Sequence, residues 1–257
     1  MLRCIVTDLD GTLLTSNKKI TEDTKQIIKE YQKNNYLFVV ATGRYFEGAR
    51  KLFDSNFHPD YLITNNGAHI YDYRKDKFIY HNYIDEKIVS SIVEKYISLA
   101  DQITLLGEKQ YIQITESILK ENKKLNDVST LAIHCKKGIN KNEVVMQLQQ
   151  SFPHLNSYLM NHSVVNYDWI EIEPSTVNKG SAIKKVFDIE KIIHQDSICF
   201  GDGANDLSMF HVCGKKIAMA NAVELLKKYA DDIALTNDEE GIEQYLKWNK
   251  NILIQKH

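Results

Sequence analysis

The chain has 257 residues, of which 43% are hydrophobic and 26% charged, and it is long enough for one sizeable α/β domain or for a domain that carries an insertion. Its 32 Lys and Arg against 34 Asp and Glu give a formal net charge of −2, so no basic excess indicates a nucleic-acid partner. No apolar run approaches the roughly 20 residues that span a bilayer, which argues against a membrane protein.

The N-terminal third alternates strand and helix patterns. Thr21 opens a helical pattern in which Ile27, Ile28 and Tyr31 share one face. Short apolar runs without polar alternation predict buried strands at Cys4–Val6, Leu37–Ala41 and Tyr61–Thr64.

The middle of the chain has a different pattern. Ile84, Ile88, Ile92 and Tyr96 repeat every four residues and predict an amphipathic helix, and a second helix is expected around Val144, Val145 and Leu148. Two of the three expected strands alternate with polar residues, so we expect a mostly antiparallel sheet with helices on one side. These strands are Tyr111–Ile114, Leu131–Ile133 and Trp169–Glu173.

The C-terminal third returns to the first pattern. A helical stretch runs through Ile183 and Phe187, and Asn221-x-x-Glu224 and Asn237-x-x-Glu240 resemble capping boxes that begin two more helices. Further apolar runs predict strands at Ile198–Phe200, Ile217–Met219 and Ile233–Leu235.

This order predicts an α/β protein with a doubly wound, parallel-sheet core and an inserted α+β domain. We expect residues 1–81 and 178–257 to form the core and residues 82–177 the insertion, with hinges near Tyr80–Ile84 and Pro174–Asn178. No apolar stripe stands apart from the expected core, so the sequence does not predict an oligomeric state.

Cysteine usage indicates the compartment. Cys4, Cys135, Cys199 and Cys213 form no Cys-x-x-Cys pair, and two of them lie inside apolar runs, where a thiol is most often a small buried hydrophobe. The pattern favours a reducing cytoplasm over a disulfide framework. Met1 leads almost directly into a strand, so we also expect no secretory signal and a cytoplasmic protein.

Two carboxylates follow the first predicted strand directly. Asp8 and Asp10 are spaced i, i+2 and therefore point the same way on an extended backbone. Two acids at the mouth of a buried strand are costly to desolvate unless a cation or a reaction needs them. One of them can act as nucleophile or metal ligand while the other transfers protons.

Other predicted strands end in residues that suit phosphoryl transfer. Leu37–Ala41 is followed by Thr42-Gly43-Arg44, and Ile198–Phe200 by Gly201-Asp202-Gly203-Ala204-Asn205-Asp206. Asn178-Lys179-Gly180 precedes a helical stretch. Because ligands of open parallel sheets bind beyond the carboxyl ends of the strands, these residues are expected to form one site.

In this order the motifs resemble those of the haloacid dehalogenase superfamily of phosphatases. Asp8-x-Asp10-Gly-Thr is similar to its first motif, Thr42-Gly-Arg to the second, Lys179 to the third, and Gly201-Asp202-Gly203-x-Asn205-Asp206 to the fourth. The insertion between the second and third motifs resembles the α/β cap of the Cof-like subgroup, and Asn66-Gly67-Ala68 resembles the loop before that cap.

The resemblance implies Mg²⁺ held by the Asp8 carboxylate, the Asp10 backbone carbonyl and Asp202. Chemistry supports this set, because Mg²⁺ suits an all-oxygen site with few carboxylates. Asp8 is our expected nucleophile, and its attack on phosphorus would form an aspartyl-phosphate. Asp10 would protonate the departing alkoxide and then deprotonate the attacking water.

The remaining motif residues are expected to contact the phosphoryl group or to support the site. Two roles are open for Arg44, a contact near the phosphate and an ordinary salt bridge. Asn205 and Asp206 can also cap the following helix. Thr42 would contribute its hydroxyl and its N–H to a phosphoryl oxygen. The expected phosphate-binding residues are Thr42, Gly43, Lys179 and Asn205, and the expected supporting residues are Asp206 and Arg44.

Two features of the insertion could bind a ligand, but an ordinary structural role is favoured for each. Tyr167 and Trp169 could stack on a substrate ring, but packing is favoured. His134-Cys135 has no second metal-ligand pair, so a role at a strand edge is favoured over a metal site.

The resemblance therefore implies Mg²⁺-dependent hydrolysis of small phosphate monoesters, with the cap selecting the leaving group. Sugar phosphates are its commonest implication, and pyridoxal phosphate and flavin mononucleotide stay open. One alternative is a phosphomutase of the phosphomannomutase type. Another is a catalytically silent sensor of phosphate esters, although such proteins usually lack a nucleophile or proton-transfer residue. The physiological substrate is not predicted, because the cap loops carry no recognisable pattern.

Overall fold

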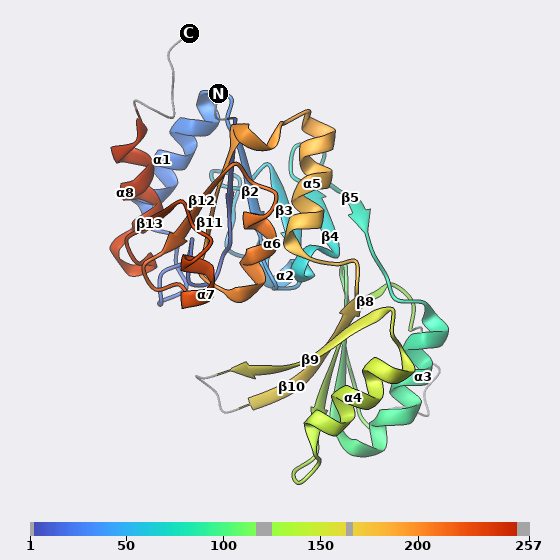
Figure 1. The fold of residues 1–257 in the computed structure, drawn as a ribbon. Coiled ribbons are helices and arrows are strands. Elements are labelled where there is room, and N and C mark those ends of the chain that lie inside the picture. The colour runs from blue at the N-terminus through green and yellow to red at the C-terminus, as the bar shows by residue number, and fades with distance from the viewer. Residues whose placement is uncertain (1–2, 117–124, 163–166, 251–257) are drawn as a thin grey trace. The chain divides into compact units, whose positions relative to one another are not determined.

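The structure, a computed structural model, describes residues 3–116, 125–162 and 167–250 (Figure 1). The chain divides into two units, one formed by Met1–Tyr80 with Asn178–His257 and the other by His81–Val177. Within the described ranges, no helix has both the length and the apolar character needed to cross a membrane.

The first unit is built on an eight-stranded sheet in the order β13-β12-β11-β1-β2-β3-β4-β5. The strands from β13 to β3 pair in parallel, and β4 pairs antiparallel with β3. The bounds are β1 (Cys4–Thr7), β2 (Leu37–Ala41), β3 (Tyr61–Thr64), β4 (His69–Asp72), β5 (Lys77–His81), β11 (Ser197–Gly201), β12 (Lys215–Met219) and β13 (Asp232–Ala234).

The predicted α/β class with a parallel core sheet is confirmed, with one addition at the sheet edge. The hairpin of β4 and β5 was not predicted. All residues of β4 are buried, and β5 is half-buried between exposed ends. The apolar runs, Ile70-Tyr71 in β4 and Phe78–Tyr80 in β5, are short and lie between polar residues, so the sequence pattern did not separate these strands from the turn that joins them.

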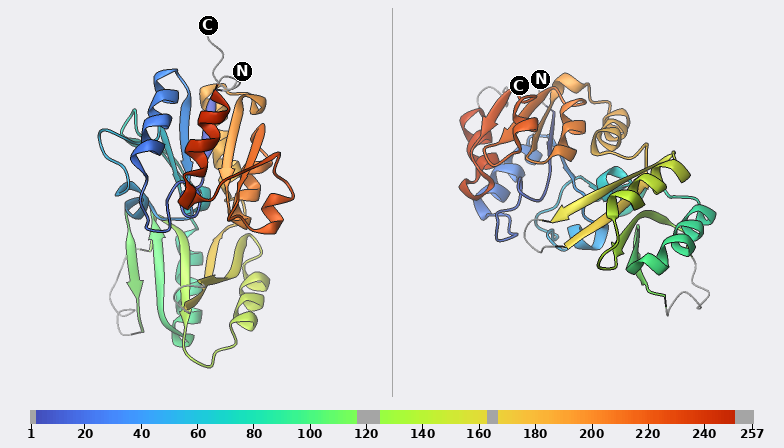
Figure 2. Two further views of the ribbon diagram at one scale, coloured as in Figure 1. Left: turned by 90° about the vertical axis from the view of Figure 1, so that its left-hand side faces the viewer. Right: turned by 60° about the horizontal axis from the view of Figure 1, so that its bottom comes forward.

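Helices cover both faces of this sheet (Figures 1 and 2). One face packs on α1 and α8 and the other on α5 and α6, and each face has its own cluster of buried apolar side chains. The helices are α1 (Glu22–Lys33), α2 (Phe46–Arg50), α5 (Lys179–Glu190), α6 (Leu207–Phe210), α7 (Glu224–Lys227) and α8 (Gly241–Trp248), with short 3₁₀ turns η1 (Asn65–Gly67), η3 (His194–Asp196), η4 (Ala204–Asp206) and η5 (Asn237–Glu239).

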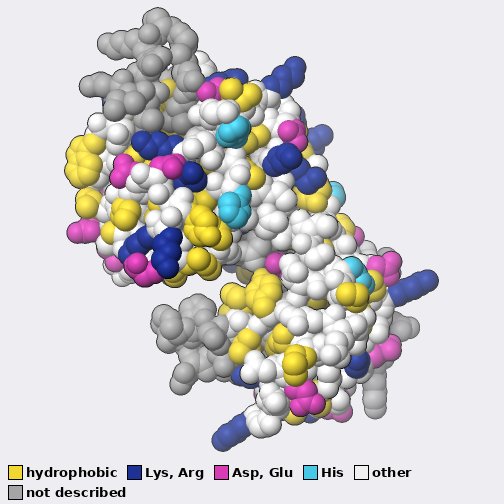
Figure 3. All heavy atoms as spheres, viewed as in Figure 1, with side chains coloured by type: hydrophobic (Ala, Val, Ile, Leu, Met, Phe, Trp, Pro, Cys, Tyr) yellow, Lys and Arg dark blue, Asp and Glu magenta, His cyan; other side chains and the backbone are white. Residues whose placement is uncertain are grey.

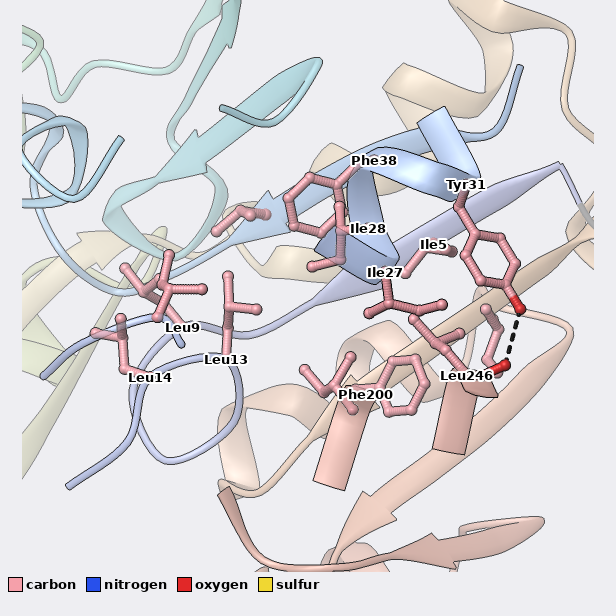
Figure 4. Close-up of a cluster of buried hydrophobic side chains, with 14 of the residues drawn as sticks. Ile5, Leu9, Leu13, Leu14, Ile27, Ile28, Tyr31, Phe38, Phe200 and Leu246 are labelled. Atoms are coloured by element: carbon pink, nitrogen blue, oxygen red, sulfur yellow. Dashed lines mark hydrogen bonds between the residues drawn. The ribbon is translucent and has the colours of Figure 1, made fainter. Parts of the chain in front are cut away.

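The start of α1 follows its sequence pattern. Thr21 is the N-cap and its hydroxyl accepts a hydrogen bond from the Thr24 N–H at 3.2 Å. Ile27, Ile28 and Tyr31 are buried on the inner face. Figure 4 shows part of this cluster, in which the Tyr31 hydroxyl donates to the carbonyl oxygen of Leu246 at 3.1 Å and so fixes α1 against α8.

The two predicted capping boxes near the C-terminus are wrong. The N-cap of α7 is Val223, and the capping box near η5 joins Thr236 and Glu239. Asn221 instead connects loops, because its amide donates to the Gly11 carbonyl at 2.8 Å and accepts from the Asn237 N–H at 3.1 Å. A long-range polar contact has displaced the local cap that the sequence favoured.

The second unit contains a five-stranded antiparallel sheet in the order β7-β6-β8-β10-β9. Helices α3 (Glu86–Tyr96) and α4 (Lys141–Ser151) share one apolar cluster with this sheet (Figure 1), and η2 (Ile97–Leu99) follows α3. The strands are β6 (Ala100–Gly107), β7 (Tyr111–Ile114), β8 (Val128–Cys135), β9 (Leu155–His162) and β10 (Tyr167–Pro174).

The antiparallel sheet with helices was expected here, but β6 and β9 were not. Both strands mix polar and apolar residues without a clean alternation, so their sequences do not separate strand from loop. The inclusion of Ile84 in the predicted helix is wrong, because Asp85 is the N-cap of α3 and its side chain accepts a hydrogen bond from the Lys87 N–H.

We predict that Ile28→Ala lowers the free energy of unfolding of the first unit by about 2–5 kcal/mol. Ile28 is 0% exposed and the shortened side chain would leave a cavity between α1 and the sheet. Urea unfolding followed by circular dichroism measures the change. Ile189→Ala is the matched control, since Ile189 is 48% exposed on a helix, and an equal loss in both variants would contradict the packing argument.

Candidate functional site

The site begins where neighbouring parallel strands end. Strand β1 pairs with β11 in the register Thr7 to Phe200, so Asp8 and Asp202 follow adjacent strand ends at the same edge of the sheet. Thr42 follows β2 on the other side of β1. Asp8 is buried at 5% exposure, although a lone buried carboxylate would be strongly disfavoured.

A buried lysine compensates this charge. The Lys179 ammonium lies 2.5 Å from Oδ1 of Asp8 and 2.6 Å from Oδ1 of Asp206, and its side chain is 1% exposed. Lys179 is the first residue of α5, whose N-cap Asn178 forms a capping box with Ser181. The helix start therefore aims this side chain at the ends of β1 and β11.

Gly180 allows α5 to come this close. A Cβ at this position would lie 2.1 Å from the carbonyl oxygen of Ser208 in α6, which is shorter than any real contact. The Gly180 N–H also donates to the Ser208 hydroxyl at 3.2 Å. The close approach of α5 to α6 is what places Lys179 beside Asp206.

Asp206 shapes the loop after β11. While its Oδ1 binds Lys179, its Oδ2 accepts the N–H groups of Asp202 and Gly203, both at 2.9 Å. Both oxygens of Asp206 are therefore engaged by the protein. Its buried carboxylate holds the backbone of Asp202 in place.

Asp202 is oriented from the other side by the Asp8 loop. The Thr12 hydroxyl donates to Oδ1 of Asp202 at 2.6 Å. A Cβ on Gly11 would lie 2.4 Å from Oδ2 of Asp202, and Gly11 has a φ of +80°, so both space and backbone conformation require glycine there. The absent side chain leaves room beside a carboxylate oxygen.

Asp8 and Asp206 contact the buried ammonium of Lys179, and Asp202 lies nearby; the pKa values of Asp8, Asp202 and Lys179 reflect this arrangement. Burial raises the pKa of Asp8, with Asp206 and Asp202 adding to the rise and Lys179 opposing it. Burial and the neighbouring Asp206 also raise the pKa of Asp202 to about 6, against the hydrogen bond from Thr12. Burial alone would lower the pKa of Lys179, but Asp206 and Asp8 raise it, so the ammonium keeps its proton.

This cluster suits a divalent cation. Carboxylate oxygens of Asp8, Asp202 and Asp206 can be chosen within 4.8 Å of one another. Since Asp206 is engaged by Lys179 and by two N–H groups, Asp8 and Asp202 are the carboxylates better placed to bind an ion. An added cation would offset the burial of their charge, and hard oxygen donors of this kind suit Mg²⁺.

Asp10 is held by two other cations. Arg44 contacts it through two bonds, Nε to Oδ2 at 2.5 Å and Nη2 to Oδ1 at 2.6 Å, and the Lys18 ammonium lies 2.7 Å from Oδ1. Burial acts to raise the pKa of Asp10, but the hydrogen bonds from Arg44 and Lys18 outweigh it and lower the pKa. Asp10 is thus held as a carboxylate.

The loop after β2 presents a hydroxyl. Thr42 is 2% exposed, and its N–H is used in a bond to the Ile63 carbonyl at 2.9 Å, so the expected contribution of this N–H to a ligand is wrong. Its hydroxyl oxygen accepts the Arg44 N–H at 3.1 Å, which leaves the hydroxyl hydrogen to be donated.

Asn66 lies between Gly43 and Asn205. The Asn205 amide donates to Oδ1 of Asn66 at 3.3 Å, and the same oxygen would lie 2.9 Å from a Cβ on Gly43. Asn66 belongs to η1, which the resemblance singled out without assigning it a contact. Asn205 therefore lies in the same loop cluster as Gly43, with Asn66 between them.

The motif residues thus form two groups of hydrogen-bonded and ion-paired side chains rather than one. Asp8, Asp202, Asp206 and Lys179 are linked directly, whereas Asp10 is linked with Arg44 and Lys18. No role was predicted for Lys18 or for Thr12. The role of Thr12 could have been predicted from its position directly after Asp-x-Asp-Gly. The contact of Lys18 could not, because no spacing rule connects Lys18 with Asp10.

Comparisons with known proteins agree with the motifs. A family model described as haloacid dehalogenase-like hydrolase matches residues 5–246. A protein of Buchnera aphidicola subsp. Schizaphis graminum is 32% identical over 271 residues, which covers 98% of this chain and 97% of that protein. A Bacillus subtilis protein named 5-amino-6-(5-phospho-D-ribitylamino)uracil phosphatase YitU is 26% identical over 264 residues, covering 95% and 96%.

A solved structure shows the same fold. The crystal structure of a haloacid dehalogenase-like hydrolase from Bacteroides thetaiotaomicron has a TM-score of 0.81 and 25% sequence identity, and the match covers 96% of this chain and 99% of that chain. Both the parallel sheet and the separate antiparallel sheet lie within this match.

We predict that Lys179→Met lowers the free energy of unfolding by about 3–5 kcal/mol at pH 7, because removing one partner leaves buried carboxylates without a cation. Urea unfolding measures the change, and adding Asp206→Asn should recover part of the loss. Lys216→Met is the control, since the Lys216 pair with Asp231 is partly exposed and should contribute at most about 1 kcal/mol. Equal losses in both single variants would refute the central role of Lys179.

Proposed function

Because this chain belongs to the haloacid dehalogenase-like hydrolase family, we propose that it is an Mg²⁺-dependent phosphatase of small phosphate monoesters. The observation that carries the proposal is the buried Asp8, paired with Lys179 at the end of β1 and adjacent to Asp202. The phosphatase name of the Bacillus subtilis relative points to the same reaction class and to phosphate esters of small metabolites.

Asp8 is the proposed nucleophile. Lys179 contacts its Oδ1, and within the described residues no side chain donates to its Oδ2, which is therefore the oxygen available for attack. In the first step, Oδ2 forms a bond to phosphorus while the bond from phosphorus to the ester oxygen breaks. The product is an aspartyl-phosphate on Asp8 and a free alkoxide that needs a proton.

Mg²⁺ fits the residues present. Asp8 and Asp202 would hold it through their carboxylates, with the Asp10 backbone carbonyl as the third protein donor. When bound, Mg²⁺ would reduce the repulsion between the Asp8 carboxylate and the negatively charged phosphoryl group. Thr12 and Asp206 would keep Asp202 oriented toward this ion through the contacts described above.

Asp10 is the proposed proton-transfer residue. Its present contacts with Arg44 and Lys18 favour the carboxylate form, which suits the second step, in which Asp10 takes a proton from the attacking water. Protonation of the leaving alkoxide in the first step requires Asp10 to carry a proton. We infer that Arg44 and Lys18 must loosen their contacts with Asp10 before that step.

Thr42, Gly43, Lys179 and Asn205 are the proposed phosphate-binding residues. The Thr42 hydroxyl hydrogen and the Lys179 ammonium are donors that can neutralise charge on the phosphoryl oxygens in the transition state. Asn205 would contribute its amide after parting from Asn66. The insertion, residues 82–177, is the proposed cap that selects the leaving group.

We predict that Asp8→Asn lowers kcat for a panel of phosphate esters by at least ~10³-fold, because the amide cannot form the aspartyl-phosphate. Phosphate release in the presence of Mg²⁺ measures this. Asp188→Asn on the exposed face of α5 is the matched control and should keep full activity. Mass spectrometry during turnover should find a phosphoryl group on the peptide that contains Asp8, and an active Asp8→Asn protein without this adduct would refute the proposal.

Removal of divalent ions should abolish turnover, and Mg²⁺ should restore it. Asp202→Asn should weaken Mg²⁺ binding by about 10–100-fold, measured by calorimetry without substrate. Full activity in chelator-treated buffer would contradict the metal assignment.

With a hexose 1-phosphate, release of inorganic phosphate supports hydrolysis, whereas an isomeric sugar phosphate without phosphate release would indicate a mutase.

A further inference from the structure

The loop that follows β1 is held on its inner side by apolar packing. We call residues 8–19 the Asp10 loop. Its three leucines, Leu9, Leu13 and Leu14, are at most 4% exposed and join the apolar cluster of the sheet (Figure 4). The Leu14 N–H also donates to the Leu9 carbonyl at 2.8 Å, so the chain around Asp10 forms a tight turn between buried side chains.

The outer side of the Asp10 loop is held by polar side chains from two other loops of the same unit. Asn221, in the loop after β12, donates its amide to the Gly11 carbonyl at 2.8 Å. Asn237, the first residue of η5, donates its amide to the Leu14 carbonyl at 2.8 Å. The Asn237 N–H donates to Oδ1 of Asn221 at 3.1 Å, which orients the Asn221 amide so that its nitrogen faces Gly11.

A further contact from η5 lies farther along the Asp10 loop. The Asp238 carboxylate accepts both the N–H and the hydroxyl of Ser16, each at 2.7 Å. Ser16 lies two residues before Lys18, whose ammonium contacts Asp10. The loops after β12 and β13 therefore contact the Asp10 loop at three separate positions.

The bond to the Gly11 carbonyl is the contact nearest to the proposed chemistry. Gly11 directly follows Asp10 and has a φ of +80°. Its carbonyl belongs to the peptide group that leads into Thr12, whose hydroxyl donates to Asp202 at 2.6 Å. Because glycine can adopt many backbone conformations, the bond from Asn221 selects one direction in which the chain leaves Asp10.

The position of Asp10 cannot depend on its side-chain contacts throughout the proposed cycle. Arg44 and Lys18 hold the carboxylate, but both contacts must loosen before Asp10 protonates the leaving oxygen. At that step the backbone has to keep Asp10 aimed at the ester oxygen. A displacement of about 1 Å in a reacting group can lower a rate by about 100-fold.

We propose that Asn221 is a positioning residue for proton transfer by Asp10 and acts through the Gly11 carbonyl. This inference rests on the proposed phosphatase function and adds a residue that the motifs do not contain. In the step concerned, the bond from phosphorus to the ester oxygen breaks while the carboxyl proton of Asp10 moves to that oxygen. Asp10 is left as a carboxylate and the leaving group departs as a neutral alcohol.

The test compares two esters that differ in how much the leaving group needs a proton. Phenyl phosphate releases a basic phenolate, whereas the nitro group of p-nitrophenyl phosphate stabilises the released phenolate. Phenol release in a single turnover, with excess enzyme and saturating Mg²⁺, reports on this step alone. Asn221→Ala should lower the rate for phenyl phosphate by about 10-fold or more, and the rate for p-nitrophenyl phosphate by less than about 2-fold.

Asn34→Ala is the matched control. The Asn34 amide also donates to a backbone carbonyl at 2.8 Å, that of Glu30, and both asparagines are exposed. Asn34 precedes the start of β2 and therefore lies at the edge of the sheet opposite Asp10. Both esters should react with this variant at the wild-type rate, and circular dichroism verifies that each variant is folded.

A double variant shows whether Asn221 acts through Asp10. Asp10→Asn should slow phenyl phosphate more than p-nitrophenyl phosphate, and adding Asn221→Ala should not change the ratio of the two rates further. A further change of this ratio, or an equal effect on both esters in Asn221→Ala, would overturn the inference and leave the phosphatase function intact. If the wild-type protein cleaves neither ester with Mg²⁺, the proposed function fails and the inference fails with it.

Discussion

The site of the first unit depends on one buried cation shared by two carboxylates. Lys179, Asp8 and Asp206 come from the start of α5, the end of β1 and the loop after β11, and Lys179 is separated from Asp8 by 171 positions and from Asp206 by 27. None of these buried charges is stable alone, so each element must dock correctly for the other two to be tolerated. The same contact that assembles the core thus positions the carboxylate that we propose as nucleophile.

The site contains two cation–carboxylate groups with different properties, one around Lys179 and one around Asp10. Lys179 is 1% exposed and cannot leave without uncovering Asp8 and Asp206, whereas Lys18 is more than half exposed and can leave Asp10 at little cost. A rigid group suits a nucleophile, which must stay aimed at phosphorus. A replaceable partner suits Asp10, which has to change its protonation twice in each proposed cycle. The surface of the first unit is otherwise a mixture of both charges, as Figure 3 shows for one side.

The sequence predicted what depends on strand ends and missed what depends on long-range contacts. Asp8, Thr42 and Asp202 follow short apolar strands that were predicted to form a parallel sheet, so their common edge of the sheet was predictable. The contact of Lys18 with Asp10, the bonds from Asn221 to other loops, and the use of the Thr42 N–H by β3 follow from tertiary packing. Strand β6 was missed for a related reason, since neither periodicity nor composition separates it from a loop.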